Sequence, residues 1–160
     1  MQQGILRPAA VRLAGTKPST RKGASLALMP FKYSIHPGQN LIRQTLWGTV
    51  TAGELQDLAT AMWEDPQYRK KLDILADLRQ ARVDIPFDEM MAYTRFLSGN
   101  SHIGKQAIVV GRQLEFGMAR MYEQLTEYSV LRTELKVFFD MDAAERWIGC
   151  EAANRQQVGA

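Results

Sequence analysis

The chain has 160 residues, of which 46% are hydrophobic and 23% charged, as expected for one ordinary globular domain with a core of its own. Its single cysteine, Cys150, excludes an internal disulfide and any multi-cysteine metal site, and it suits a reducing, cytoplasmic environment. No apolar run reaches the roughly 18 to 20 residues of a spanning helix, so we expect no membrane span.

The net charge of +3 comes from the first part of the chain. Seven of the 20 basic residues precede the first acidic residue, Glu54, and acidic residues outnumber basic ones after that point. Nucleic-acid binding needs Lys and Arg clustered on one folded surface. We therefore expect no nucleic-acid partner for the folded part of the chain.

Residues 1–28 contain no acidic or aromatic residue, and Gly, Pro, Ser and Thr interrupt each short apolar run. Such a segment buries too little surface to offset the entropy of ordering it, so we predict a disordered basic N-terminal extension. A transit peptide has the same composition, and Met29 is an alternative natural start because "MPFKYSI" leads directly into a strand. Residues 151–160 are predicted to form a flexible C-terminal tail.

Alternating apolar and polar residues predict a hairpin at the start of the folded part. "FKYSIH" (31–36) and "NLIRQTLWG" (40–48) read as strands, and Pro37-Gly38 between them is a typical turn pair. A connection this short makes the two strands antiparallel neighbours.

Caps, prolines and glycines mark the helices that follow. Thr51 and Glu54 have the spacing of a capping box, and Asp65-Pro66 ends the helix that it begins. The later elements expected are a strand at 71–78, a helix from Pro86 to Gly99, a strand at 105–111, a helix at about 113–128, a strand at 134–140 and a last helix capped by Asp142.

The resulting order is β-β-α-β-α-β-α-β-α. Strands separated by single helices need right-handed crossovers, which give parallel pairing. We therefore expect one α/β domain over residues 29–150, with a mostly parallel five-stranded sheet, an antiparallel edge strand and helices packed against the sheet.

Four segments of residues 30–149 carry a resemblance to a known group. They are "GTVTAGEL", "WEDPQYRKKLDILADLR", "KQAIVVG" and "KVFFDMDAAERWI". With this element order, the chain resembles the SpoIIAA-like superfamily, which includes the STAS domains of anti-sigma-factor antagonists and sulfate transporters. It is most similar to the small bacterial STAS/SEC14-like branch. The resemblance implies an interaction or ligand-binding module.

One departure limits what the resemblance implies. Phospho-regulated STAS domains have a serine where the matching strand meets its helix, but "RQARVDIPFDEMM" (79–91) contains no Ser or Thr. The phospho-switch of anti-sigma-factor antagonists is therefore not expected here. The chain is also much shorter than a complete SEC14-type domain that encloses a lipid.

Two groups of residues are candidates for binding. Open α/β sheets bind ligands at the carboxyl ends of their strands, and the third strand is followed there by a charged loop with Asp77, Arg79, Arg82 and Asp84. These charges either bind a ligand or partner or form surface ion pairs. For Asp77, a hydrogen bond to loop amides that fixes the turn is a further alternative.

The second group is apolar. Met91 and Met121 lie off the apolar stripes of the second and third helices, so with Phe87 and Tyr128 they are candidates for an apolar groove or a dimer seam. The alternative is that the methionines fill the core.

No pattern predicts catalysis, a metal or a cofactor. His36 and His102 are not expected to converge, and "GKQ" (104–106) lacks the spacing of a phosphate-binding loop. Our leading hypothesis is a non-enzymatic STAS-like module that acts through a protein partner or as a homodimer. The alternative is a small carrier that binds an apolar or lipid-like molecule between the second and third helices.

Overall fold

The computed structural model describes residues 29–99, 104–129 and 133–149, so the predictions for residues 1–28 and 151–160, for His102 and for Cys150 lie outside the described residues. The elements are β1 (Phe31–His36), a 3-10 turn (Pro37–Gln39), β2 (Leu41–Val50), α1 (Ala52–Glu64), β3 (Asp73–Val83), α2 (Phe87–Ser98), β4 (Gln106–Val110), α3 (Gln113–Glu127), β5 (Leu135–Phe138) and α4 (Met141–Ile148).

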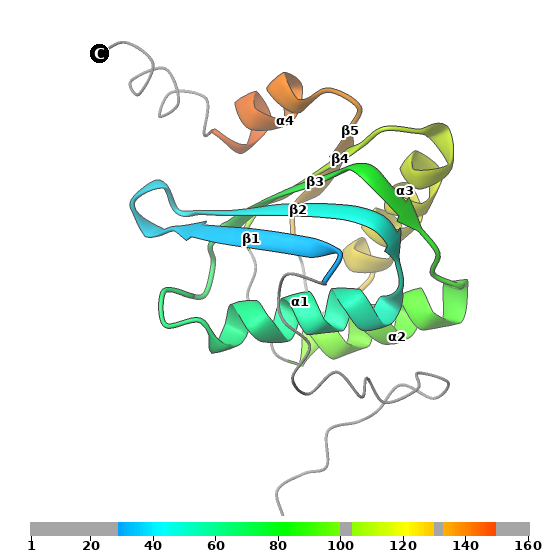
Figure 1. Cartoon of the computed structure of the whole chain (residues 1–160), viewed down its shortest axis with the longest axis horizontal. Coiled ribbons are helices and arrows are strands. Elements are labelled where there is room, and N and C mark those ends of the chain that lie inside the picture. The colour runs from blue at the N-terminus through cyan, green and yellow to red at the C-terminus, as the bar shows by residue number, and fades with distance from the viewer. Residues whose placement is uncertain (1–28, 100–103, 130–132, 150–160) are drawn as a thin grey trace, which may run out of the picture.

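The strands form one five-stranded sheet in the order β1-β2-β3-β4-β5. β1 is antiparallel to β2 and the other neighbours are parallel, which confirms the predicted class and topology. Because each right-handed crossover steps in the same direction across the sheet, the three crossover helices lie on the same face. Figure 1 shows α1, α2 and α3 on that face and α4 on the other.

Apolar side chains are buried on both faces of the sheet. The larger cluster packs under α1, α2 and α3 and includes Ile42, Ile74 and Ile108. The smaller cluster packs Leu41, Leu75, Ala107 and Val109 against Ala144 and Ile148 of α4. Burial on both faces explains why the central strands read as nearly continuous apolar runs.

The capping box that begins α1 is present, with the Thr51 amide donating to Glu54 Oε2 at 2.8 Å. The predicted cap of the last helix is wrong. Asp140, not Asp142, caps α4, and its carboxylate accepts from the amides of Asp142 and Ala143. β5 ends at Phe138, earlier than expected, so the helix begins at Met141 and leaves Asp140 extended at the cap position.

The predicted end of the third strand is also wrong, because β3 continues to Val83. β2 runs on to Val50 and pairs with residues 80–83 of β3, whereas β4 pairs with β3 only as far as Leu78. Arg79 and Arg82 therefore lie on a strand and not in a loop. The register of β2 and β3 shifts after the Thr45–Asp77 pair, which places an irregularity at the start of the charged stretch.

Candidate functional site

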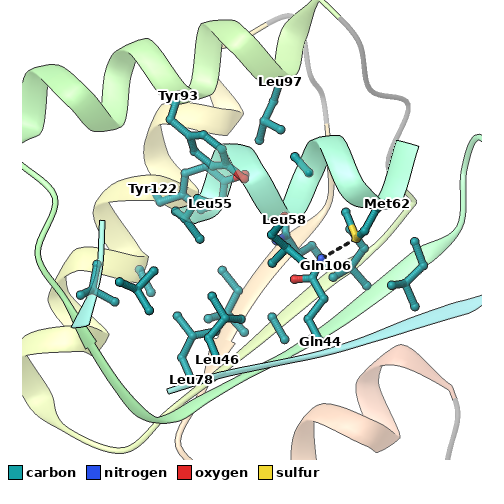
Figure 2. Close-up of a pocket in the computed structure, with 18 of the residues that line it drawn as sticks. Gln44, Leu46, Leu55, Leu58, Met62, Leu78, Tyr93, Leu97, Gln106 and Tyr122 are labelled. Carbon is teal, nitrogen blue, oxygen red and sulfur yellow. Dashed lines mark hydrogen bonds between the residues drawn. The ribbon is translucent and has the colours of Figure 1, made fainter. Parts of the chain in front are cut away.

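A cavity of about 90 Å³ lies between the sheet and the helices α1, α2 and α3. Figure 2 shows side chains of the sheet, Gln44, Leu46 and Leu78, on one side of it and side chains of the helices, among them Tyr93 and Tyr122, on the other. Its lining is mostly apolar with a few polar groups, which is the composition typical of small-molecule sites.

Three alanines explain why this region of the core is not filled. Ala59 of α1, Ala76 of β3 and Ala119 of α3 all line the cavity and are all buried. Each has a single methyl group where a longer side chain would reach into the space. At about 24 cal/mol per Å³, an empty cavity of this size costs roughly 2 kcal/mol of stability relative to a filled one.

Two of the residues that line the cavity each have a buried polar atom without a hydrogen-bond partner among the described residues. These atoms are Gln106 Oε1, at the start of β4, and Glu115 Oε2, in the first turn of α3. The Glu115 side chain is 1% exposed, and its other oxygen, Oε1, pairs with Arg112 Nη2. A buried acceptor without a partner costs about 1 to 3 kcal/mol, so both oxygens are suited to accept from a bound molecule.

Glu115 is not among the residues predicted from the sequence, although a pattern was available. Residues 115, 119, 122 and 126 are spaced by whole helical turns, and all four are buried in α3. An acidic residue in the first turn of a helix is common, because the macrodipole favours it there, so the residue type alone does not single out Glu115. Gln106 reaches the cavity because it lies on the same face of β4 as Ile108.

Tyr93 of α2 and Tyr122 of α3 face each other at the helical side of the cavity, with ring centroids 6.1 Å apart. Burial raises the pKa of both hydroxyls above the ordinary value of 10.0. Tyrosine hydroxyls are already protonated at neutral pH, so both can donate a hydrogen bond as well as accept one.

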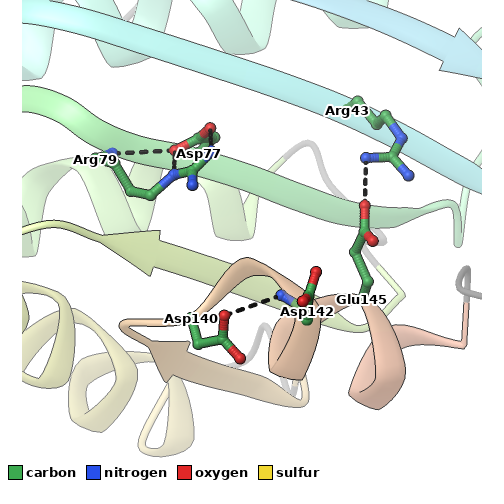
Figure 3. Close-up of polar contacts among 6 residues, drawn as sticks. All are labelled: Arg43, Asp77, Arg79, Asp140, Asp142 and Glu145. Atoms are coloured by element: carbon green, nitrogen blue, oxygen red, sulfur yellow. Dashed lines mark hydrogen bonds and ion pairs between the residues drawn. The ribbon is translucent and has the colours of Figure 1, made fainter.

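Two of the charged residues at the carboxyl edge of the sheet, Asp77 and Arg79, are paired with each other. Asp77 Oδ1 accepts from the Arg79 amide at 3.1 Å and from Arg79 Nε at 2.9 Å, and Asp77 Oδ2 lies 2.8 Å from Arg79 Nη2 (Figure 3). The hydrogen bond from the Arg79 side chain holds the pKa of Asp77 below its ordinary value, against the opposing effect of burial. Asp77 thus binds a backbone amide, as the structural alternative predicted, although within a strand and not in a turn.

The other predicted site residues are placed separately. Arg79 and Arg82 line one shallow groove together with Arg112, and Asp84 does not line it. Phe87 is 55% exposed at the start of α2, whereas Tyr128 follows the end of α3, at the opposite edge of the sheet. Met121 packs partly against the main core. The lining of the cavity includes none of Phe87, Met91 and Met121, so their role in binding stays a prediction.

Within the described ranges, no three His, Cys, Asp or Glu side chains come together in a way that would hold a metal ion. His36 Nε2 instead lies 2.9 Å from Ser34 Oγ. None of the helices in these ranges combines the length and apolar character that crossing a membrane requires.

The architecture defines the class of the protein: an α/β domain with a SpoIIAA-like fold. A solved structure of an uncharacterised protein from the DUF3478 family, from Shewanella loihica PV-4, is described as having this fold, and its match covers 79% of this chain and 99% of that one. The TM-score is 0.51 and the sequences are 16% identical, so the likeness concerns the fold. No protein-family model and no curated protein matches the chain.

Proposed function

We propose that this chain is a non-enzymatic binding module that holds a small, largely apolar molecule between the sheet and the helices α1, α2 and α3. The observation that supports the proposal is the cavity with two buried acceptors, Gln106 Oε1 and Glu115 Oε2, that have no partner among the described residues. A bound molecule would fill the empty space and donate a hydrogen bond to an unpaired acceptor, and both contacts would stabilise the folded chain.

The size of the cavity limits the ligand. An apolar cavity of roughly 150 Å³ binds benzene, so a cavity of about 90 Å³ suits a smaller molecule, of roughly four or five non-hydrogen atoms. A complete acyl chain exceeds this space unless α2 or α3 moves. The proposed ligand is therefore smaller than a whole lipid. It is a short apolar molecule, or the end of a longer one.

The polar groups of the cavity support binding more than catalysis. The lining contains no Ser, Cys or His among the described residues, and Glu115 already forms an ion pair with Arg112. Nucleophilic catalysis needs a nucleophile within hydrogen-bond reach of a base. The groups that line this cavity offer hydrogen bonds without such a pair.

Native mass spectrometry of freshly purified protein, together with a high-resolution crystal structure, tests the proposal. We expect added mass of a small organic molecule, and electron density for it beside Glu115. A cavity filled by ordered waters that bind Gln106 and Glu115, with only the mass of the chain itself, would contradict the proposal, since about 90 Å³ also has room for roughly two or three waters.

A second candidate function is contact with a protein partner or a second copy, supported by the exposed apolar side chains at the carboxyl edge of the sheet. Phe87, Leu114 and Phe139 follow β3, β4 and β5 there and are 55%, 66% and 45% exposed. Phe139 stacks on Phe116 with ring centroids 4.6 Å apart. Aromatic residues next to arginines are typical of the residues that dominate binding energy in interfaces.

The double variant Leu114→Ser with Phe139→Ser tests this second candidate by sedimentation velocity. If the wild-type chain self-associates through this edge, the variant should be monomeric at concentrations where the wild type is not. A wild type that stays monomeric throughout, or a variant that associates equally, would remove support for a homodimer through these residues.

A further inference from the structure

The unpaired atoms of the residues that line the cavity, Gln106 Oε1 and Glu115 Oε2, are both hydrogen-bond acceptors, and this restricts the chemistry of what binds there. We propose that the ligand carries a neutral hydroxyl group, which donates its hydrogen to Glu115 Oε2 while an apolar tail of a few carbons occupies the rest of the cavity. The inference rests on the proposed function, because it names the class of molecule that the same cavity takes.

Glu115 lies in the lining of the cavity, with its carboxylate buried. Glu115, Ala119 and Tyr122 lie on one face of α3 in successive turns, and all three line the cavity. Because Ala119 has only a methyl group, the space between the carboxylate and the Tyr122 ring is not filled by α3 itself. A short molecule placed there would contact the carboxylate at one end and aromatic and aliphatic side chains at the other.

The charge of Glu115 is already compensated. Arg112 Nη2 pairs with Oε1, so the carboxylate needs a hydrogen bond at Oε2 more than it needs a second positive charge. Burying an ammonium group in an apolar cavity carries a large desolvation penalty, which a carboxylate that is already paired offsets poorly. A ligand carboxylate would be repelled and would have no hydrogen to donate. These considerations favour a neutral donor.

A hydroxyl also matches the other polar groups of the cavity. It donates one hydrogen and accepts through its oxygen, whereas an ammonium only donates and an ether only accepts. Burial raises the pKa of the Tyr122 hydroxyl, as it does for Tyr93, and both groups are protonated donors at neutral pH that can bind the oxygen of the ligand. Gln106 Oε1 offers a second acceptor for the same class of donor.

Four small probes separate the alternatives in an NMR titration of the ¹⁵N-labelled full chain. 1-Butanol and diethyl ether have the same atoms, but only the alcohol donates a hydrogen bond. Butylammonium and butyrate replace the hydroxyl by a cation and an anion. We expect 1-butanol to bind at least about tenfold more tightly than diethyl ether, as one hydrogen bond to a charged acceptor would provide, and more tightly than either ion.

The variant Glu115→Gln, with Glu127→Gln on the exposed face of α3 as the matched control, assigns the effect to one residue. The preference for 1-butanol over diethyl ether should fall below about threefold in Glu115→Gln and stay unchanged in Glu127→Gln. If Glu115→Gln does not fold, the comparison of the four probes on the wild-type chain decides the question without it.

The outcomes separate this inference from the proposed function. Equal binding of 1-butanol and diethyl ether with shifts at the cavity residues would overturn the hydroxyl inference and leave a binding cavity. Tighter binding of butylammonium would overturn it in favour of a cationic ligand. If no probe causes saturable shifts at the cavity residues, the proposed function itself fails.

Discussion

Asp77 accepts hydrogen bonds from both the backbone amide and the side chain of Arg79, two residues further along β3. The pair lies where the register between β2 and β3 shifts and where β3 begins to extend beyond the end of β4. At this point β3 loses a neighbour on one side, and the carboxylate supplies a partner for a backbone amide. The Asp77–Arg79 pair therefore has a structural role that is independent of any ligand.

Removing the carboxylate should destabilise this part of β3. We expect Asp77→Ala to lower the free energy of unfolding by about 1 kcal/mol at neutral pH, as for the loss of one hydrogen bond and a partly exposed ion pair. The folded-state pKa of Asp77 lies below its ordinary value of 3.8. The contribution of Asp77 is therefore complete above the unfolded-state pKa and is lost as the pH falls through the lower folded-state pKa.

Urea unfolding of the wild type and of Asp77→Ala at a series of pH values measures this effect. The difference between the two should shrink toward zero in acid. Asp77→Asn is the control, because it keeps an oxygen for the Arg79 amide without the charge, and it should be intermediate. A difference that stayed constant down to about pH 2 would show that the carboxylate charge does not contribute.

Gly111 is held against β3. A Cβ at this position would lie 2.7 Å from the carbonyl oxygen of Arg79. We expect Gly111→Ala to lower the free energy of unfolding by about 1 to 3 kcal/mol, because β4 and β3 would have to separate locally.

Gly117 provides the matched control in thermal unfolding. A Cβ there meets nothing within 4 Å, and the residue lies inside α3, so Gly117→Ala should stabilise the protein by about 0.5 to 1 kcal/mol. Equal effects of the two substitutions would argue against the close approach of Gly111 to Arg79.

Asp140 caps α4, and Asp142 is the second residue of the helix. Asp140→Ala should cost about 1 kcal/mol because two amides lose their acceptor. Asp142→Ala removes only a favourable charge near the N-terminus of the helix and should cost about 0.5 kcal/mol or less. Chemical unfolding of both variants checks the order, and a larger effect at Asp142 would reverse the assignment of the cap.

Filling the cavity should stabilise the protein and prevent binding. Ala119→Leu adds three carbons to a position that lines the cavity. We expect a gain of about 1 kcal/mol, below the full value of roughly 2 kcal/mol for removing an empty space of this size, because the added side chain will not match its shape.

Ala92→Leu is the control for this substitution, since Ala92 lies on α2 outside the cavity lining and is partly exposed. It should change the melting temperature little. A loss of stability in Ala119→Leu comparable with overpacking of a filled core, about 1 to 3 kcal/mol, would indicate that the cavity has no room for those carbons.

Local signals in the sequence were enough to predict most of the fold. The capping box of Thr51 and Glu54, the Asp65-Pro66 stop and the Pro37-Gly38 turn each act within a few residues, and each is found where it was expected. The length of β3 depends instead on β2, whose residues up to Val50 supply the pairing partners. The alternation of Ala81, Val83 and Ile85 was a weak sign of that extension.

The candidate site was harder to predict, because it depends on residues that are distant in the sequence. Ala59, Ala76 and Ala119 come from three elements, and only their meeting in space leaves a cavity. Glu115 is buried, and one of its oxygens is paired with Arg112. Composition and helix periodicity do not distinguish such a residue from an exposed acidic residue in the first turn of a helix. Surface ion pairs among the charged residues of β3 were one of the alternatives that the sequence offered, but it did not say which residues would pair; the structure pairs Asp77 with Arg79.

The most direct test of the binding cavity is one NMR titration with 1-butanol, carried out on the wild type and on Ala119→Leu. The proposal predicts saturable shifts at the amides of Gln106, Ile108 and Glu115 in the wild type and their loss in the variant. Absence of saturable shifts in the wild type, or equal shifts in a folded Ala119→Leu chain, would contradict it.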